Sequence, residues 1–370
     1  MYMYTNWTRK HDVFLKSAVF LLFFLGAVAL LGAGGSQEGS QEKSQKGSQE
    51  GSQEESQEES QEEERSEGTT ELTLILEWIP NTNHTGVFVA KEKGWYAEEG
   101  IELEVKQPTE SQTPLLVASE NADFGFAPQE MVTFARTAEN PVPVKAIATV
   151  NRRNTSGFAS PSDRDISGVE DFEGKTYGGW GSEFEEALLE AVMKKAGADF
   201  STVDIVNVGT TDFFASFRQG IDFRWIFYGW DGVRAEIEER EIDYIPLIEI
   251  DPQLDYYTPT LITRTKMLEE RPDTVRAFLR ATERGYKWAA ENPEEAGDIM
   301  LTFNSDLSEE FVHASQQYIS QQYLDEEGRW GFMEEDLWRN FGDFLREYGL
   351  LEQPFDAEAA YTNEFLPEED

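Results

Sequence analysis

The chain has 370 residues, of which 72 are acidic and 31 are basic, and its formal net charge is −41. Such an excess of negative charge repels phosphate backbones and anionic membrane surfaces, so we exclude nucleic acid as a partner. The chain contains no cysteine and three histidines, which excludes disulfides, thiolate metal ligands and histidine-rich metal centres, and we expect neither a metal nor a cofactor.

The N-terminus has the features of an export signal. Basic side chains at Arg9, Lys10 and Lys16 precede an apolar run at 17–31, and small residues follow this run. The region is similar to a bacterial lipoprotein processing site, except that Gly34 stands where the lipidated cysteine belongs. We therefore predict a signal peptide or an N-terminal membrane anchor, and a protein exported to the periplasm or the cell surface.

A Ser-Gln-Glu repeat follows the signal segment (residues 1–35) and extends over residues 36–70. It offers no apolar side chains that could build a core, and a segment of this composition cannot offset the entropy lost on ordering. We predict a disordered linker that tethers a globular part beginning at residue 71.

Beyond residue 70, short apolar runs alternate with amphipathic segments. The runs predict strands at 72–78, 101–105, 122–126, 144–150, 176–178, 203–206, 223–227, 244–248 and 260–263. The amphipathic segments predict helices at 85–93, 112–119, 128–138, 183–196, 211–218, 231–240, 272–291, 293–302, 308–322 and 334–348. This order predicts an α/β fold with mostly parallel sheets and a helical C-terminal return.

We expect two lobes joined by two crossover strands. Lobe I comprises residues 71–156 and 252–370, lobe II comprises residues 157–251, and the crossover strands lie near 155–159 and 251–260. Ligands of open α/β sheets bind beyond the carboxyl ends of the strands, so we expect the ligand to lie between the lobes.

The first candidate binding segment, residues 78–86, lies where the first strand passes into the first helix. We assign Trp78, Asn83 and His84 to one wall of the site because these side chains suit a polar heterocycle. The alternative is structural, namely a helix cap together with a turn built on Pro80.

The second candidate, residues 178–185, is a glycine-rich turn between a strand and a helix. Ser182 and Glu185 have the spacing of a capping box, which places Ser182 at the N-cap and backbone N–H groups at the helix start. Trp180 offers an aromatic face for stacking on a flat ring. We assign Trp180 and Ser182 to the opposite wall, and the alternative is a purely structural turn.

The third candidate, residues 225–232, is an apolar strand that ends in Tyr228, Trp230 and Asp231. A carboxylate beside aromatic rings can engage the exocyclic amine and ring nitrogen of an aminopyrimidine, so we assign these three side chains to the ligand site. Alternatively Asp231 only caps the helix that follows, and both roles can coexist. Tyr257 lies on the return to lobe I, where it either lines the cleft or packs in the hinge.

Two stretches of the chain resemble a known family. The first runs over residues 77–86 and continues with Ala90-Lys91-Glu92-Lys93-Gly94-Trp95-Tyr96, and the second is Tyr361-Thr362-Asn363-Glu364-Phe365-Leu366. Both are similar to the NMT1/THI5-like family, and most similar to members that bind thiamine pyrimidine precursors, over about residues 72–366. The resemblance implies a two-lobed type II periplasmic-binding-protein fold. It also implies a formylated or hydroxymethylated aminopyrimidine as ligand and the membrane permease of an ABC importer as partner.

Two alternative functions share this fold. Pyrimidine synthases of the same family carry a lysine at the position of Ala127, a sacrificed histidine at the position of Met131, and a cysteine-rich run. An alanine cannot form a Schiff base and a thioether cannot supply ring atoms, so we predict that the chain is not an enzyme. A binding protein for nitrate, sulfonate or taurine would favour an arginine over Asp231. We therefore predict a monomeric extracytoplasmic solute-binding protein that closes on an aminopyrimidine.

Overall fold

The computed structural model describes residues 68–107, 112–209, 211–351 and 353–368. The predicted signal segment and the Ser-Gln-Glu repeat as far as residue 67 lie outside the described residues. Within the described ranges, no helix is both long enough and apolar enough to span a membrane.

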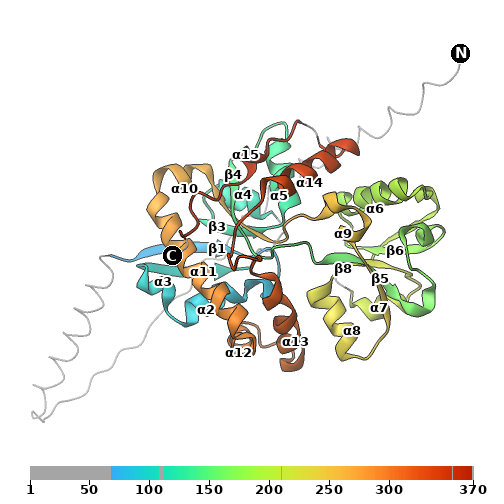
Figure 1. Ribbon diagram of the computed structural model, residues 1–370, viewed down its shortest axis with the longest axis horizontal. Helices are drawn as coiled ribbons and strands as arrows, with labels where there is room; N and C mark the ends of the chain where they lie inside the picture. Colours follow the sequence, from blue (N-terminus) through green and yellow to red (C-terminus); the bar gives the residue numbers. More distant parts are fainter. Residues whose placement is uncertain (1–67, 108–111, 210, 352, 369–370) are drawn as a thin grey trace, which may run out of the picture. The chain divides into compact units, whose positions relative to one another are not determined.

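Five strands form the first sheet, in the order β2-β1-β3-β10-β4, and Figure 1 labels three of them, β1, β3 and β4. The strands are β1 (Thr70–Ile75), β2 (Ile101–Lys106), β3 (Phe124–Ala127), β4 (Val144–Thr149) and β10 (Thr260–Arg264). β1 runs parallel to β2 and β3, whereas β10 runs antiparallel to β3 and β4. β10 therefore enters this sheet only after the chain has built a second sheet.

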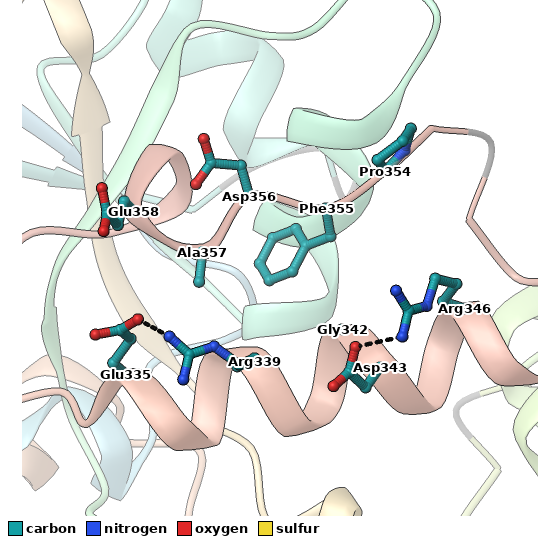
Figure 2. Close-up of a pocket in the computed structure, with 10 residues that line it drawn as sticks. All are labelled: Glu335, Arg339, Gly342, Asp343, Arg346, Pro354, Phe355, Asp356, Ala357 and Glu358. Carbon is teal, nitrogen blue, oxygen red and sulfur yellow. Dashed lines mark hydrogen bonds and ion pairs between the residues drawn. The ribbon is translucent and has the colours of Figure 1, made fainter.

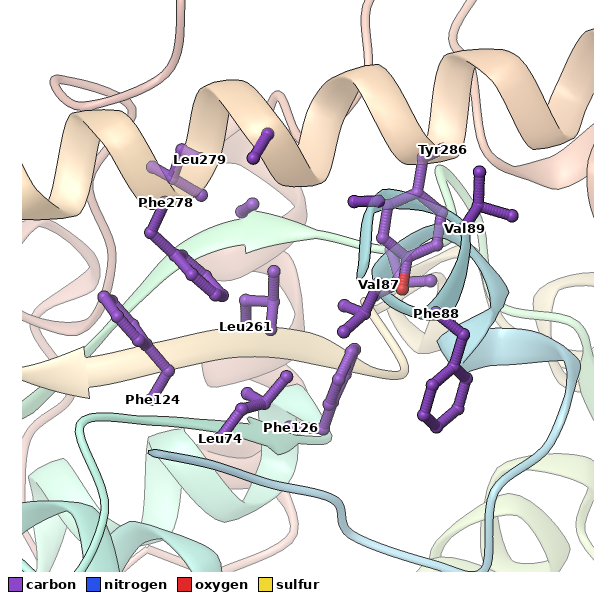
Figure 3. Close-up of a cluster of buried hydrophobic side chains, with 14 of the residues drawn as sticks. Leu74, Val87, Phe88, Val89, Phe124, Phe126, Leu261, Phe278, Leu279 and Tyr286 are labelled. Carbon is purple, nitrogen blue, oxygen red and sulfur yellow. The ribbon is translucent and has the colours of Figure 1, made fainter. Parts of the chain in front are cut away.

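Helices from both ends of the chain belong with the first sheet, and the last long one also packs against the core of the second sheet. They are α2 (Thr85–Glu92), α3 (Trp95–Glu98), α4 (Thr113–Ala118), α5 (Gln129–Thr137), α10 (Thr265–Glu270), α11 (Pro272–Glu291), α12 (Pro293–Phe303), α13 (Glu309–Ile319), α14 (Glu335–Glu347) and α15 (Ala357–Ala360). α11 packs its apolar face on the sheet, where Phe278 stacks on Phe124 at 3.9 Å between ring centroids (Figure 3). α2 crosses α11 so closely that a Cβ on Gly285 would lie 1.9 Å from the carbonyl oxygen of Gly86.

The second sheet has the order β8-β5-β9, and the pair β6-β7 lies next to it. The strands are β5 (Ser156–Pro161), β6 (Thr176–Gly179), β7 (Asp204–Asn207), β8 (Arg224–Phe227) and β9 (Ile242–Pro246), with helices α6 (Glu183–Ala196), α7 (Phe213–Phe217), α8 (Val233–Ile237) and α9 (Leu247–Ile250). An isolated bridge between Tyr177 and Phe223 joins the two groups of strands.

The expectation of mostly parallel strands is wrong for the second sheet. β6 and β7, which α6 connects, are parallel, as a helical crossover requires. β5 instead runs antiparallel to both β8 and β9, because it carries the chain in from the first sheet.

The chain passes between the two sheets twice, at residues 150–155 and 251–259. Hydrogen bonds join the two passages: the Asn154 side chain donates to the carbonyl of Leu254 at 2.8 Å, and Arg153 forms an ion pair with Asp255 at 2.6 Å. Short helical turns complete the fold: η1 (Thr82–His84), η2 (Ser162–Arg164), η3 (Val169–Phe172), η4 (Phe200–Thr202), η6 (Pro252–Leu254) and η7 (Ser320–Gln322).

Three predicted elements differ most from the structure. The predicted strand 72–78 is β1, which ends three residues earlier, at Ile75. The predicted helix 231–240 consists of a π-helical turn, η5 (Tyr228–Gly232), followed by the short α8. The predicted strand 244–248 lies earlier, as β9, and Leu247 begins α9 because the preceding Pro246 has no N–H to continue the ladder. The predicted helices 183–196 and 272–291 coincide with α6 and α11.

Candidate ligand-binding site

A surface hollow of about 310 Å³ lies between α14 and the segment around Phe355 (Figure 2). Its two arginines are already paired, Arg339 with Glu335 and Arg346 with Asp343. A second hollow lies between α3 and α11, beside Trp95 and Trp288. Neither hollow is lined by a side chain that we predicted to bind the ligand. Most of these side chains instead follow the carboxyl ends of β1, β6 and β8.

The turn after β6 depends on a glycine. Gly181 has φ +86°, in the left-handed region, and a Cβ there would lie 2.2 Å from the Asn207 side chain. The turn exposes Trp180, of which 37% is accessible, and Ser182. Ser182 is the N-cap of α6, as predicted, but its side chain makes no capping hydrogen bond.

The carboxylate of Glu185, in the first turn of α6, accepts a backbone hydrogen bond from the glycine-containing turn after β6. Its Oε2 accepts a hydrogen bond from the backbone N–H of Trp180 at 2.8 Å, and the N–H groups of Gly181 and Ser182 lie close enough to favour the charged carboxylate. The Tyr177 hydroxyl donates to Oε1 at 2.5 Å. Burial raises the pKa of Glu185, and these hydrogen bonds oppose the shift. Glu185 thus reaches back to the turn before α6, but Ser182 does not complete the predicted capping box.

Aromatic side chains on β8 adjoin the turn after β6. The Trp180 ring lies 6.2 Å from Phe227, nearly parallel to it, and 5.6 Å from Trp225. The Nε1 atom of Trp225 is buried and has no hydrogen-bond partner among the described residues. Trp225 and Phe227 were missed as candidates, although they are two residues apart on one strand and so share a face, a signal that the alternation of β8 already contained.

Tyr228 and Trp230 lie in the π-helical turn η5, which packs against α13. The Tyr228 ring lies 5.1 Å from Tyr318, and Trp230 meets Phe311 edge-on at 4.8 Å. The Tyr228 hydroxyl donates to Oε1 of Glu236 at 2.5 Å, and burial followed by this neighbour raises the pKa of Tyr228 to about 12.

A chain of hydroxyl groups ties η5 to the loop before α2. The Ser315 hydroxyl on α13 donates to the carbonyl of Gly229 at 2.6 Å, and it lies 2.7 Å from the hydroxyl of Thr82. Because Ser315 uses its proton on Gly229, Thr82 is the donor to Ser315. The loop that contains Asn83 and the turn that contains Asp231 are thus linked through one side chain.

Asp231 lies beside cationic groups without a hydrogen bond to them. Burial raises the pKa of Asp231 to about 6, and the charges of Arg224 and Arg234 oppose this shift. The Arg224 guanidinium donates to the carbonyl of Thr211 at 2.7 Å rather than to Asp231. Among the described residues, no group donates a hydrogen bond to the Asp231 carboxylate. The N-cap of α8 is Gly232, so Asp231 does not cap this helix.

Trp78 and Asn83 lie beyond the carboxyl end of β1. Trp78 is 47% exposed. The Asn83 side-chain oxygen accepts a hydrogen bond from Asn151 at 3.0 Å, and the Asn83 carbonyl accepts one from the Tyr286 hydroxyl at 2.6 Å. Asn83 is therefore held in place while it stays half-buried.

His84 is fully buried, and both of its ring nitrogens have partners. Nδ1 accepts a hydrogen bond from the backbone N–H of Asn81 at 3.1 Å, so the proton of the neutral ring is on Nε2, which lies 2.9 Å from Glu77. The ring also meets Phe126 edge-on at 4.7 Å. In this arrangement His84 stabilises the turn before α2, which is the structural role considered for this segment. Contact between His84 and a ligand remains a prediction.

Tyr257 is buried in the passage between the sheets. Its hydroxyl accepts a hydrogen bond from the backbone N–H of Glu334 at 2.7 Å, and its own N–H donates to the Gln129 side chain at 2.8 Å. Next to Gln129, Glu130 has a buried Oε2 without a partner among the described residues, and burial raises the pKa of Glu130 to about 8. Glu130 was not singled out by the sequence, which gives no sign of its burial.

Trp180 thus follows the carboxyl end of β6, and Tyr228, Trp230 and Asp231 follow that of β8, which the bridge between Tyr177 and Phe223 places beside β6. Trp78 and Asn83 lie at the carboxyl end of β1, in the loop that Ser315 links to η5. Within the described ranges, no group of three or more acidic or histidine side chains is arranged to hold a metal ion.

Comparisons with known proteins agree on the family. A family model described as NMT1/THI5 like matches residues 81–296. The formylaminopyrimidine-binding protein of Halalkalibacterium halodurans is 28% identical over 299 residues, which cover 78% of this chain and 89% of the relative. The 4-amino-5-hydroxymethyl-2-methylpyrimidine phosphate synthase of Legionella pneumophila is 25% identical over 311 residues, which cover 81% of this chain and 93% of the relative.

A solved structure confirms the predicted fold. The periplasmic aliphatic sulphonate binding protein SsuA of Escherichia coli matches with a TM-score of 0.62 at 13% identity, over 81% of this chain and 94% of that one. The chain therefore has the α/β, two-lobed type II periplasmic-binding-protein fold.

Proposed function

The chain belongs to the NMT1/THI5-like family, and from this premise we propose that it is the extracytoplasmic solute-binding protein of an ABC importer. Its ligand is a thiamine pyrimidine precursor of the aminopyrimidine type, held between the two lobes. Its partner is the membrane permease of the importer. The proposal is supported by the relative that is named for binding formylaminopyrimidine and by the fold shared with a periplasmic binding protein.

The observation that carries the proposal is an exposed aromatic face beside a carboxylate that has no internal hydrogen bond. Trp180 lies nearly parallel to Phe227, and Asp231 is in the turn that begins directly after Phe227. An aminopyrimidine has a flat ring that gains from stacking. Its exocyclic amine can donate to a carboxylate that is free to accept.

The residues at the synthase positions favour binding over catalysis. Ala127 is fully buried on β3, where its carbonyl accepts the Thr260 hydroxyl, and its methyl group cannot form a Schiff base. Met131 supplies a thioether where the synthases carry a histidine. The proposal is therefore that the chain performs no chemistry on its ligand.

Titration calorimetry with formylaminopyrimidine tests the proposal directly. We expect binding to the wild-type chain, and a loss of roughly 1–3 kcal/mol, or about fivefold to more than a hundredfold in affinity, for Trp180→Ala because a stacked ring loses its platform. Trp288→Ala is the matched control, since Trp288 lines the hollow beside α3 and should leave the affinity unchanged.

Mass spectrometry of ligand carried through native purification provides an independent check. Recovery of an aminopyrimidine would support the proposal. Binding of taurine or nitrate without any pyrimidine would replace it by the anion-binding alternative. A new absorbance band on addition of pyridoxal phosphate would replace it by the synthase alternative.

A further inference from the structure

The turn between β6 and α6 contains the donors that an oxyanion would need. The N–H groups of Trp180, Gly181 and Ser182 come together at the start of a 14-residue helix, where the helix dipole also favours negative charge. The Tyr177 hydroxyl adds a fourth donor. In this chain the Trp180 N–H and the Tyr177 hydroxyl both donate to the carboxylate of Glu185, and the N–H groups of Gly181 and Ser182 lie close enough to favour its charged form.

Glu185 also fills the space against the strand end. A Cβ on Gly179 would lie only 2.9 Å from its Oε2, so the carboxylate rests directly on the backbone of β6. The side chain of Glu185 is 2% exposed, whereas Gly181 and Ser182 are exposed. The carboxylate therefore reaches these donors from the buried side of the turn, whereas the turn itself is exposed.

The charges around the turn act in the same direction. Glu183 and Glu186 lie in the same first turn of α6 and are exposed. Arg224, a cation close to the turn, donates to the carbonyls of Gly178 and Thr211, and its positive charge is offset by the carboxylates around it, Asp231, Glu185 and Asp212. An incoming phosphate or sulfonate would find its donors taken and negative charge on both sides.

We infer that Glu185 is a specificity-determining residue that takes the place of a ligand oxyanion and restricts the site to ligands without a phosphate, sulfonate or carboxylate group at this turn. The inference rests on the proposed function, because it takes the turn after β6 as part of the ligand site. It narrows the ligand class to uncharged, unphosphorylated aminopyrimidines.

Three variants of the full chain test this role, with methanesulfonate and inorganic phosphate as probes in titration calorimetry. Glu185→Ala frees the donors and the space, so it should bind at least one probe at least tenfold more tightly than the wild type. Glu185→Gln keeps an acceptor oxygen in the same space and should gain no anion binding. Glu186→Ala removes the same charge from the same helical turn without freeing a donor, and it should also gain none.

An equal gain in all three variants would mean that net charge alone excludes anions, and it would overturn the inference. A folded Glu185→Ala variant without any gain would overturn it as well. If Glu185→Ala does not fold, Glu185→Ser retains a hydroxyl as a partner for Tyr177 and leaves most of the space open, and the same tenfold criterion applies.

The outcome is independent of the test of the proposed function. A wild-type chain that binds no pyrimidine, together with a Glu185→Ala variant that gains anion binding, would overturn the proposed ligand and keep the role of Glu185. Pyrimidine binding by the wild type without anion binding by Glu185→Ala would keep the proposed ligand and overturn the role of Glu185.

Discussion

The affinity of the site for an aminopyrimidine should depend on the charge of Asp231. Asp231→Asn replaces a charged acceptor by an amide that turns donors toward the donors of the ligand, so the affinity for formylaminopyrimidine should fall by roughly 1.5–3 kcal/mol, about tenfold to a hundredfold or somewhat more. Because burial raises the pKa of Asp231 to about 6, the wild-type affinity should also weaken as the pH falls from 8 to 5. The affinity of the variant should not change in this way. Calorimetric titrations at both pH values measure this difference.

The control for Asp231 is Glu238→Gln, which removes an exposed charge at the end of α8 and should leave the affinity unchanged. The pKa of Asp231 is higher in the folded chain than its ordinary value of 3.8, so its ionisation opposes folding as the pH rises through about 6. Since Gly232 caps α8, the substitution removes no cap and should not lower the melting temperature at pH 8. An unchanged affinity would remove Asp231 from the site.

Glu130 should make the stability of the fold depend on pH. Burial raises its pKa from an ordinary 4.5 to about 8, and a buried carboxyl without a partner for Oε2 resists ionisation. The stability that Glu130 contributes is fully present below pH 4.5 and is lost as the pH rises through 8. Glu130→Gln should therefore be more stable than the wild type at pH 9, by up to about 4 kcal/mol, and nearly equal to it at pH 5.

Urea unfolding at the two pH values measures the Glu130 effect. Glu186→Gln, an exposed carboxyl on α6, is the control and should show no such pH dependence. If Glu130→Gln and the wild type lose stability in parallel between pH 5 and 9, the carboxyl of Glu130 is ionised at neutral pH and has a partner that the structure does not show.

At the scale of single residues, the sequence indicated where a side chain lies relative to the strands better than which groups surround it. Trp180 and Asp231 could be placed at strand ends because runs of apolar residues stop just before them. The hydrogen bonds of His84 could not be foreseen, since Asn81 and Glu77 use both ring nitrogens only once the turn has closed. The hydrogen bonds that Glu185 accepts were partly predictable, because the capping-box spacing indicated that its carboxylate reaches back to the backbone.

At the scale of elements, helix bounds were predictable where local signals mark them. α6 ends at Ala196 because Gly197 adopts φ +79°, and Pro272 starts α11. The π-helical turn η5 was not predictable, because its shape depends on contact with α13, which is distant in sequence. A Cβ on Gly229, for example, would lie 2.9 Å from the side chain of Ile319.

α14 shows a second limit of sequence reasoning about elements. Its Trp338 belongs to the core beneath the first sheet, whereas Phe341 and Phe344 belong to the core that contains Phe158 of the second sheet. The apolar periodicity of the helix predicts one buried stripe. It contains no information on how the stripe is divided between two cores.

The crossing of α2 and α11 makes a prediction for Gly285. Gly285→Ala would place a Cβ 1.9 Å from the carbonyl oxygen of Gly86, and two helix backbones cannot move apart without losing their packing. We expect a loss of about 2 kcal/mol or more in the free energy of unfolding, measured by chemical denaturation.

Gly297→Ala on α12 is the matched control for Gly285→Ala. The three atoms nearest to its Cβ would all belong to the ring of the partly exposed His313, the closest at 2.6 Å, and a side chain can rotate away. Alanine also has the better helix propensity, so this variant should be neutral or slightly stabilised. Equal losses in the two variants would show that the backbone contact at Gly285 is not what limits substitution.

At the scale of the whole molecule, the two-lobed architecture was predictable because apolar runs and amphipathic segments alternate in two series. The strand directions in the second sheet were not, since they depend on which strand carries the chain between the sheets. The first strand begins at Thr70, whose N–H donates to the carbonyl of Gly100, so β1 includes one residue that we assigned to the linker.

The net charge of −41 leads to a prediction about salt. With 72 acidic and 31 basic side chains, acids remain in excess even if every base is paired, so repulsion must outweigh attraction among surface charges. Exposed pairs such as Arg280 with Glu99 contribute only about 0–1 kcal/mol each, so screening them costs little. The Debye length falls from about 10 Å at 0.1 M to about 3 Å at 1 M salt, which removes most of the repulsion. The melting temperature should therefore rise when sodium chloride is raised over this range.

Screening can be separated from the general stabilising effect of excluded salts. Chloride and sulfate at equal ionic strength screen alike, whereas sulfate is also excluded from protein surfaces and strengthens apolar burial. If screening dominates, most of the rise in melting temperature should already occur with chloride and should level off as the Debye length drops below the spacing of surface charges. A melting temperature that is unchanged in chloride and rises only in sulfate would contradict the argument, because it would show that the surplus carboxylates are too far apart to destabilise the fold.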